Sequence, residues 1–407
     1  MTMVRGSDVV VVGAGIVGAA AAYELARRGA RVTLVEGEHA AWGASGRNPG
    51  FVWLHTRAAG VQLELGMAGR RMYDELVVEL DDFEFRACGG MTYFFEEQVD
   101  LFPAFVQERL DAGLPMELLD GSAARAACPI LPATVAGATF NPIDAHINTE
   151  RLVLALVAAA ERAGTTVVRA HVETLDVASG RCRGVLTDAG AIGADVTVVA
   201  TGVWTSSLVA RLGIELPTVP MRLQVVETEP VELRFDPILY GPTAVRQYAF
   251  ARALPGYEEA RFTHPIELLT PGLEMLELAA QRRDGRILLG CPMDFPGLND
   301  RPTVAGIAMT LTVLADHLPA LRDLPVGRSW AGLLPETPDA LPIVGGVAGI
   351  DGLLLATGHV FGNLAGPITG RIVAQLVHEE PAAFDPEPLR LDRPALEHAA
   401  RAGHGRW

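Results

Sequence analysis

The most informative absence from this 407-residue sequence is lysine, because all 33 basic residues are arginine. A chain without lysine cannot form a Schiff base through a side-chain amine, use lysine as a general base, or place an ammonium beside a cofactor. Cysteine is also scarce, and no Cys-x-x-Cys spacing occurs. Neither a metal site nor a redox pair is therefore expected. The four thiols, Cys88, Cys128, Cys182 and Cys291, fit buried free cysteines in a reducing compartment.

Positive charge and long apolar runs are limited as well. The formal net charge is −16, which disfavours nucleic acid or an anionic membrane surface as partner. No apolar run reaches the length of a transmembrane helix. The apolar segment near the N-terminus carries a glycine motif and is not interpreted as a signal peptide. We expect a cytoplasmic protein, large enough for two domains.

The stretch that organises the chain is a glycine motif between two apolar runs. Four consecutive valines precede Gly13, and Gly15 and Gly18 complete a Gly-x-Gly-x-x-Gly turn before an alanine-rich segment. A second apolar run ends on Glu36, so the stretch predicts a β-α-β unit. In this motif the glycines allow a tight turn, approach of a pyrophosphate and close helix packing, and the helix N-terminus attracts phosphate. Glu36 is suited to accept hydrogen bonds from ribose hydroxyls. An ordinary βαβ turn without nucleotide is the alternative.

Further segments extend this unit. The polar stretch 42–50 can continue the phosphate cradle through Ser45 and Arg47, although a plain surface loop also fits. Helices are predicted over 61–80, 102–112 and 152–160. A buried strand over 196–200 ends at Thr201 and Gly202, at the carboxyl edge where open α/β sheets bind ligands.

The last third of the chain predicts an inserted region and a return to the first sheet. Short strand candidates at 222–228, 245–250 and 286–289 alternate with prolines, and a helix is expected over 304–318. A final strand at 353–356 is followed by a glycine-rich loop at 357–366. Pro367 stands where the next helix is expected to begin. Its N-terminus would offer a second dipole end to a ligand, and a neutral loop-to-helix junction is the alternative.

Together these segments resemble the D-amino-acid-oxidase-like FAD-dependent oxidoreductases, the group of glycine oxidase, sarcosine oxidase and D-amino-acid dehydrogenases. The resemblance follows the family's order over nearly the whole chain. It rests on 13–36, on Ala44-Ser45-Gly46-Arg47-Asn48, on 198–204 with Pro217 and Pro220, on 337–345, and on Ala356-Thr357-Gly358-His359.

This resemblance implies FAD rather than NAD and a two-domain α/β architecture. A Rossmann-type FAD-binding domain would be built from the discontinuous segments 1–82, 143–220 and 331–407. An α+β substrate domain with a mostly antiparallel sheet would comprise 83–142 and 221–330. Carried over by position, the cofactor-binding residues, with Arg47 from the same loop, would be Gly13, Gly15, Ile16, Glu36, Ala44, Ser45, Arg47, Pro49, Gly50, Phe51, Val172, Thr201, Gly202, Gly358, Gly362, Asn363 and Leu364.

Three departures affect the substrate site. The family's Gly-x-Arg-Pro element, whose arginine holds a substrate carboxylate, reads Gly332-Leu333-Leu334-Pro335 here. A second family arginine, in the loop after Gly-His, is replaced by Val360-Phe361. The lysine that activates oxygen in monomeric sarcosine oxidase has no counterpart. The family's usual residues for holding a substrate carboxylate and for activating oxygen are therefore missing from this chain.

The reaction implied by the resemblance is oxidation of the C–N bond of an amine or amino acid. Hydride transfer to flavin N5 would give an imine that water hydrolyses, and aromatic walls would favour the neutral amine by desolvation. If the substrate is an anion, Arg246 is the first choice for its clamp, with Tyr248 on the same face of a predicted strand. Arg57 and Arg222 are alternatives for the same role.

His359 would lie near the flavin, in a catalytic or a structural role, and His55 is a weaker choice. Cys291 could bind flavin covalently, but a buried thiol is the simpler interpretation. Two other functional classes stay open: a flavoprotein subunit that passes electrons within a hetero-oligomer, and a nucleotide-binding protein that is not an enzyme. The expected partner is a small amine or amino acid, with oxygen, a quinone or a partner protein as electron acceptor.

Overall fold

The run of four valines forms the central strand of the first sheet. The computed structural model describes residues 7–394, 396 and 407. In it β1 (Ser7–Val12) pairs in parallel with β2 (Val32–Glu36) and β11 (Gly190–Val199). The strand order is β17-β18-β10-β11-β1-β2-β8; the carboxyl end of β11 also pairs directly with β18, and β9 pairs with β10. The remaining strands are β8 (Thr166–Arg169), β9 (Val172–Ala178), β10 (Arg181–Thr187), β17 (Ile343–Val347) and β18 (Ile350–Thr357).

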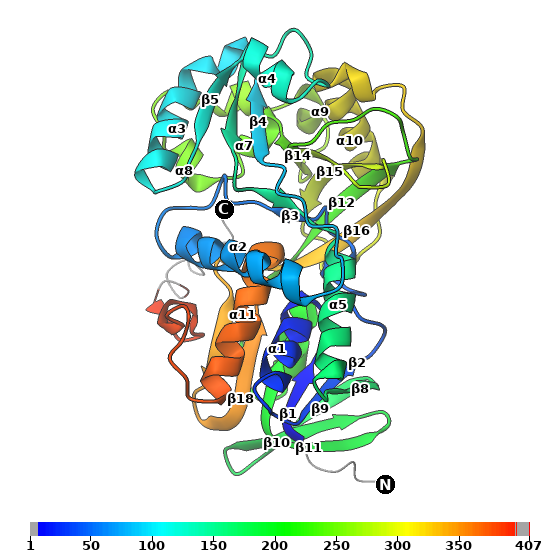
Figure 1. The fold of residues 1–407 in the computed structure, drawn as a ribbon, viewed down its shortest axis with the longest axis vertical. Helices are drawn as coiled ribbons and strands as arrows, with labels where there is room; N and C mark the ends of the chain where they lie inside the picture. The colour runs from blue at the N-terminus through cyan, green and yellow to red at the C-terminus, as the bar shows by residue number, and fades with distance from the viewer. Residues whose placement is uncertain (1–6, 395, 397–406) are drawn as a thin grey trace.

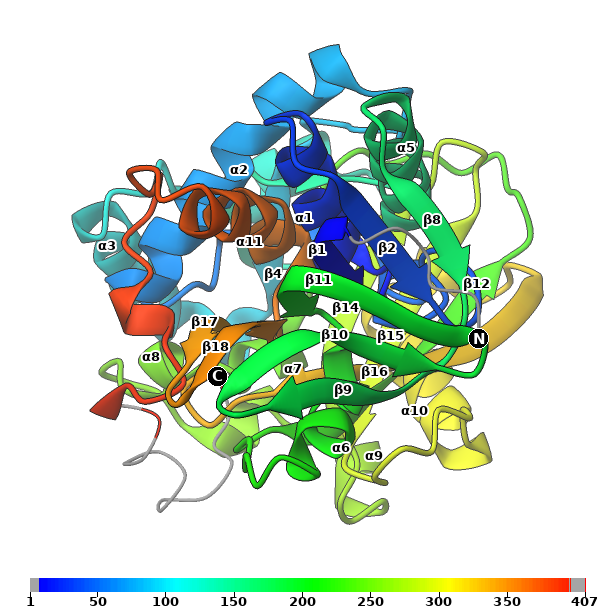
Figure 2. The same cartoon turned by 90° about the horizontal axis from the view of Figure 1, so that it is seen from below.

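Different layers cover the two faces of this sheet (Figure 2). Because side chains alternate along a strand, Val9 and Val11 face a helical layer and Val10 and Val12 face the β9–β10 hairpin. The helical layer consists of α1 (Ile16–Ala26), α5 (Thr149–Arg162) and α11 (Gly362–Val377), with α1 in contact with both others. The predicted β-α-β unit is confirmed.

The glycine turn brings β1, α1 and β11 into close contact. Gly13 has φ +100°, and a Cβ there would lie 2.7 Å from the carbonyl oxygen of Ala200. A Cβ on Gly18 would lie 1.8 Å from the carbonyl oxygen of Gly13. A side chain at either position would push α1 away from the sheet. The turn thus fixes the start of α1 directly above the strand ends.

The expected start of the last helix at Pro367 is wrong. α11 begins at Gly362, and Pro367 lies inside it. A proline in a helix leaves the carbonyl four residues earlier without its usual donor. Here that carbonyl belongs to Asn363, and the Tyr73 hydroxyl donates to it at 2.5 Å. Tyr73 comes from α2 (Val61–Glu79), so a distant helix supplies the missing hydrogen bond.

A second sheet forms the other lobe, above the first in Figure 1. Its order is β16-β12-β15-β14-β13-β4-β6-β5, and β13–β4 is its one parallel pair in the described structure. The strands are β4 (Gly90–Phe94), β5 (Glu117–Asp120), β6 (Gly137–Asn141), β12 (Val219–Thr228), β13 (Ile238–Tyr240), β14 (Glu274–Gln281), β15 (Ile287–Asp294) and β16 (Val326–Glu336). A short pair, β3 (Phe51–Val52) with β7 (Ala145–His146), lies between the lobes.

The second sheet also has two different faces. Leu276 and Leu278 belong to the apolar cluster that includes Phe51 and Trp53, whereas Met275 and Ala279 pack with α10 (Val304–His317). One face is therefore covered by α10 and the other is turned toward the first lobe. The domain division predicted above remains a proposal, which these two sheets support. The other helices are α3 (Phe102–Asp111), α4 (Gly121–Ala127), α6 (Thr205–Ala210) and α9 (Pro265–Leu268).

The strand predicted over 245–250 is wrong. The chain forms two short helices there, α7 (Pro242–Val245) and α8 (Ala249–Arg252). Pro242 is the first residue of α7, where its fixed φ and missing N–H favour a helix start. The alternation of Arg246, Tyr248 and Phe250 imitated a strand, but the preceding Gly-Pro pair decided the local structure.

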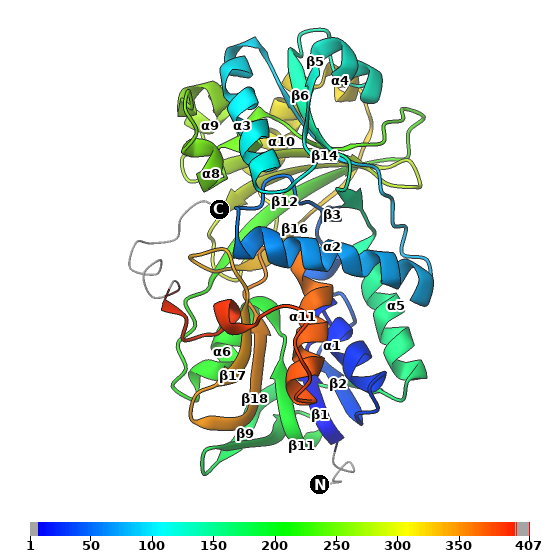
Figure 3. The same cartoon turned by 60° about the vertical axis from the view of Figure 1, so that its left-hand side comes forward.

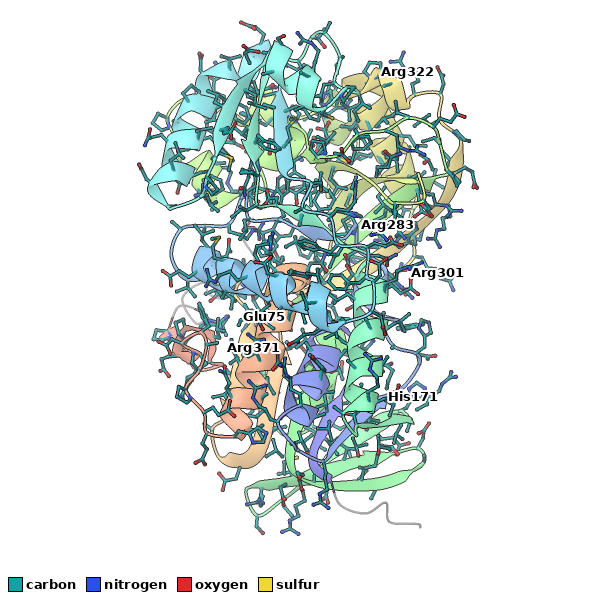
Figure 4. All side chains as sticks on the ribbon, viewed as in Figure 1. Glu75, His171, Arg283, Arg301, Arg322 and Arg371 are labelled. Carbon is teal, nitrogen blue, oxygen red and sulfur yellow. The ribbon has the colours of Figure 1, made fainter. Side chains whose placement is uncertain are left out.

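Helix α2 crosses the molecule between the lobes (Figure 3). Arg371 of α11 lies beside Glu75 of α2 (Figure 4), with an Nη2–Oε2 distance of 2.6 Å, and also binds Glu24 of α1. The pair with Glu75 is partly exposed and contributes little by itself, but the two pairs together link three helices. In the described part of the chain, no helix is long and apolar enough to cross a membrane.

The hydrogen bond from Tyr73 to Asn363 gives a test of how α11 tolerates its proline. We expect Tyr73→Phe to lower the free energy of unfolding by about 1–2 kcal/mol, since the Asn363 carbonyl loses its donor. In a Pro367→Ala background the loss should be smaller, because the substituted alanine has an N–H that can serve this carbonyl. Urea denaturation of the four proteins of this double-mutant cycle measures the difference. Equal losses in both backgrounds would contradict the explanation.

Candidate active site

One cavity of about 600 Å³ runs between the two sheets and along the carboxyl edge of the first. Residues of β12, β13, β14, β15 and β16 of the second sheet form the wall of its inner end, together with the segments around β3 and the start of α11. Its outer end reaches Glu36, His171 and Val172 at the β2–β8 edge, where His171 is labelled in Figure 4. A single elongated space therefore connects a nucleotide-type turn with a chamber between the lobes.

The turn end offers backbone donors at the start of a helix. Gly15 is the N-cap of α1 and, being glycine, has no side chain of its own to cap this terminus. The Ile16 N–H donates to Ser45 Oγ at 2.9 Å, which joins the 42–50 segment to the helix start. Thr201 and Gly202 follow β11 and line the same part of the cavity. Unfilled N–H groups and a helix dipole suit the phosphates of a dinucleotide.

Glu36 lies where the ribose of such a ligand is expected. Its Oε2 accepts from the Ala14 N–H at 2.7 Å and its Oε1 accepts from the Glu38 N–H at 2.9 Å. These two bonds fix the carboxylate at the wall of the cavity, and each oxygen retains a further lone pair for a ribose hydroxyl. The sequence motif thus gives the geometry that dinucleotide binding requires.

Aromatic rings enclose the inner chamber. The Phe51 and Tyr240 rings are stacked with centroids 5.7 Å apart, and the Trp53 and Tyr240 centroids are 4.2 Å apart. Phe361 and Trp407 line the same space, together with Leu223, Leu276, Leu278, Cys291, Leu334 and Val360. Apolar walls of this kind exclude water from a bound ligand and so disfavour the charged form of an amine on it.

Arg57 is the cation of this chamber. Its side chain is buried, its Nη2 donates to Thr56 Oγ1 at 2.9 Å, and its guanidinium carbon lies 3.0 Å from the centroid of the Phe361 ring. Burial lowers the pKa of Arg57, while the nearby Tyr248 and Tyr240 oxygens oppose that change. Its backbone is held at both ends, by an N–H bond to Leu54 O and by the Arg109 side chain on its carbonyl.

The other polar groups of the chamber stay neutral over the ordinary pH range. Burial lowers the pKa of His359 to about 3, and its Nε2 lies 2.8 Å from Thr369 Oγ1. Burial also raises the pKa of the Cys291 thiol and, with the neighbouring Tyr248, that of Tyr240. A satisfied neutral histidine therefore fits His359 better than a proton carrier does.

Most of the expected cofactor residues line this one cavity, but five of the expected site residues do not. Those on its wall are Gly13, Gly15, Ile16, Glu36, Ala44, Ser45, Pro49, Phe51, Val172, Thr201, Gly202, Gly362, Asn363 and Leu364, and His359 joins them. The five off the wall are Arg47, Gly50, Gly358, Arg246 and Tyr248. Arg47 binds Asp300, and its carbonyl accepts from Trp330 Nε1 at 2.8 Å, so it joins the 42–50 segment to the second lobe.

Arg246 does not occupy the place expected of a substrate clamp. It is buried between α7 and α8 and forms an ion pair with Glu267. Arg222 is bound to Asp294 in the same way. Among the three arginines considered, Arg57 is the one that lines the chamber. Tyr248 contacts the site indirectly, because its hydroxyl donates to that of Tyr240 at 3.2 Å.

Sequence reasoning missed Tyr240, Trp42 and Trp204, which also line the cavity. Tyr240 ends a three-residue strand just before Gly241-Pro242, and that turn signal marks it as a strand-end residue. The two tryptophans lie 5.6 Å apart between ring centroids. They come from separate loops, so their proximity depends on the tertiary fold.

Comparisons with known proteins agree with this geometry. The family model described as FAD dependent oxidoreductase matches residues 8–376. Glycine oxidase of Pseudomonas aeruginosa is 30% identical over 93% of this chain and 97% of its own. The crystal structure of glycine oxidase from Geobacillus kaustophilus superposes with a TM-score of 0.82 at 24% identity, covering 96% of this chain and 99% of that one. L-Proline dehydrogenase from P. horikoshii gives a TM-score of 0.81 at 22% identity, over 95% and 97% of the two chains. Those two structures establish the fold.

The fixed Glu36 carboxylate leads to a test with two flavins. We expect Glu36→Ala to raise the dissociation constant for FAD about tenfold, through loss of the ribose contact and of the carboxylate that accepts from the Ala14 and Glu38 N–H groups. FMN lacks the adenosine half, so its affinity should not change. Fluorescence titration of deflavinated protein measures both constants, and Glu64→Ala on the exposed side of α2 is the control. A parallel loss of FMN binding would contradict the assignment of Glu36 to the adenosine half.

Proposed function

This chain belongs to the family of FAD-dependent oxidoreductases and oxidises the C–N bond of an amine or amino acid with FAD as cofactor; we propose that the aromatic chamber between its two sheets is where the substrate reacts. The observation that carries the proposal is the single cavity that joins the dinucleotide turn to this chamber. The fold and the flavin chemistry expected from the sequence are confirmed.

The residues of the chamber support amine oxidation without a side-chain base. When bound, FAD supplies a hydride acceptor at N5, and the oxidised substrate leaves as an imine that water hydrolyses. The amine must be neutral for its lone pair to assist. Phe51, Trp53 and Tyr240 desolvate the bound amine and so favour its neutral form. His359 is neutral and bound to Thr369 in the middle of α11, so it links the loop before α11 to that helix rather than carrying a proton.

The two competing classes receive no support. A nucleotide-binding protein without activity is excluded by membership of an enzyme family. We also propose a cytoplasmic location, which is supported by the free state of Cys88, Cys128, Cys182 and Cys291.

Anaerobic mixing tests the proposed activity. We expect the purified protein to contain FAD, and its flavin absorbance near 450 nm (roughly where oxidised flavins absorb) to bleach with a subset of D- or L-amino acids, N-methylated amino acids or simple amines. The products should be the corresponding imine-derived carbonyl compound and an amine or ammonia. A flavin-loaded protein that none of these compounds reduces would contradict the proposed function.

The absence of a titrating side chain among the described residues of the chamber predicts a particular pH dependence. We expect kcat/KM to rise with pH through the pKa of the substrate's own ammonium group and to reach a plateau above it. Two substrates with different ammonium pKa values should therefore give different midpoints. His359→Asn should leave both midpoints in place, because His359 is neutral above about pH 4. A midpoint that does not move with the substrate would assign the control to a protein group.

A further inference from the structure

Arg57 differs from the other buried arginines of the described structure in having no carboxylate partner. The buried guanidinium groups belong to Arg57, Arg109, Arg222, Arg246 and Arg393. Four of them form ion pairs, with Glu108, Asp294, Glu267 and Asp339 respectively. Arg57 forms none with any carboxylate of the described residues. A buried cation without a counterion is costly in a folded protein.

The surroundings of Arg57 leave two of its nitrogens unused. Nη2 is bound to Thr56, but Nε and Nη1 have no hydrogen-bond acceptor within the described structure, although both are buried. Asp144 is close enough to influence the group. However, one of its oxygens accepts from the Leu54 N–H at 2.6 Å, and the other lies 3.3 Å from His55 Nδ1. The Phe361 ring stabilises the cation on one side.

These unused donors belong to a residue on the wall of the chamber. Tyr240 lies on the same wall, and because Tyr248 donates to its hydroxyl oxygen, the Tyr240 proton remains available to a ligand. The remaining walls are mainly apolar, from Phe51, Leu276 and their neighbours. A ligand that fits this arrangement combines one small anionic group with an apolar body.

On the basis of the proposed function, we propose that Arg57 is the carboxylate clamp of this enzyme, with Tyr240 as second donor, and that the substrates are α-amino acids with apolar side chains. Arg57 lies in the turn before α2, on the side of the first lobe, whereas Leu334 and the pair Val360-Phe361 stand where arginines were expected. The carboxylate contact has therefore moved to a different element of the fold. A carboxylate binds a guanidinium through adjacent N–H groups, and here the free Nη1 lies beside Nη2, which uses only one of its two N–H groups for Thr56.

The first experiment compares acetate with acetamide on the wild-type holoenzyme. The two probes have the same shape, but only acetate is charged. Calorimetric titration should show acetate binding at least about tenfold more tightly, since a charge-assisted bond replaces a neutral one. Equal affinity would overturn the clamp, whether or not the enzyme oxidises amines.

The second experiment changes the cation. Arg57→Gln should raise the dissociation constant for acetate at least about tenfold and leave that for acetamide unchanged. Arg57→Lys keeps the charge without the planar fork and should recover part of the acetate affinity. Arg222→Gln is the matched control, because Arg222 is also buried and paired outside the chamber. It should not alter the ratio of acetate to acetamide affinity.

Steady-state kinetics provide the third readout. Arg57→Gln should raise KM for an apolar α-amino acid much more than for the amine that lacks its carboxylate, with a smaller change in kcat. Three results would overturn the clamp: an equal change for both substrates, loss of FAD binding with unchanged acetate affinity, or the same acetate affinity in the Gln variant as in wild type. If Arg57→Gln does not fold, the acetate to acetamide ratio of Arg57→Lys decides instead, and a ratio equal to that of wild type would argue against a fork-dependent clamp.

Failure of the clamp is distinguishable from failure of the proposed function. Bleaching of the wild-type flavin by amines or amino acids tests the function alone. A wild-type enzyme that oxidises amines but does not distinguish acetate from acetamide retains its function and loses the clamp.

Discussion

The structure depends on close contact between backbone segments at the glycine turn. Gly13 and Gly18 let the start of α1 rest directly on the ends of β1 and β11, with distances that no side chain would permit. This contact fixes the direction in which the first N–H groups of α1 point. Ser45 and Glu36 then take two of the backbone donors beside the turn, which positions the 42–50 loop and the β2 end relative to it. The nucleotide end of the cavity follows from that one constraint.

The chamber end of the cavity depends on a second feature of the backbone, a carbonyl in α11 that lacks its usual helical donor. Pro367 stands inside α11 and frees the Asn363 carbonyl, and Tyr73 supplies a donor from α2. The Asn363 side chain meanwhile donates to Asn48 Oδ1 at 2.9 Å and to the Phe51 carbonyl at 3.2 Å. Asn363 thus connects the start of α11 with the 42–50 segment and with Phe51 of the chamber wall. Packing of α2 across the two lobes therefore affects the shape of the chamber.

Local sequence patterns were sufficient for the nucleotide end of the first lobe and insufficient for the start of α11 and the substrate site. The Gly13 to Glu36 unit was predictable because a valine run, a glycine turn and an acid at the right distance all indicate one structure. The strand expected around Arg246 failed because alternation of polar and aromatic residues occurs in short helices too, and Pro242 decided between them. The start of α11 was placed too late because proline is usually a first-turn residue, and the compensating Tyr73 is 290 residues away. Tyr240 and Arg57 meet in the chamber through tertiary packing alone, which spacing along the chain does not encode.

The distribution of charge explains why Arg57 stands out in a chain with a net charge of −16. Carboxylates outnumber basic groups, 49 to 33, so a buried arginine readily acquires an acidic partner within the protein. Arg222 and Arg246 have done so, and each is thereby removed from ligand binding. Asp144, the acid near Arg57, forms no ion pair with it: one of its oxygens accepts from the Leu54 N–H, and the other lies 3.3 Å from His55 Nδ1. The aromatic face of Phe361 then offers stabilisation that does not consume the N–H donors. A cation held in this manner stays available to a carboxylate that enters the chamber from outside.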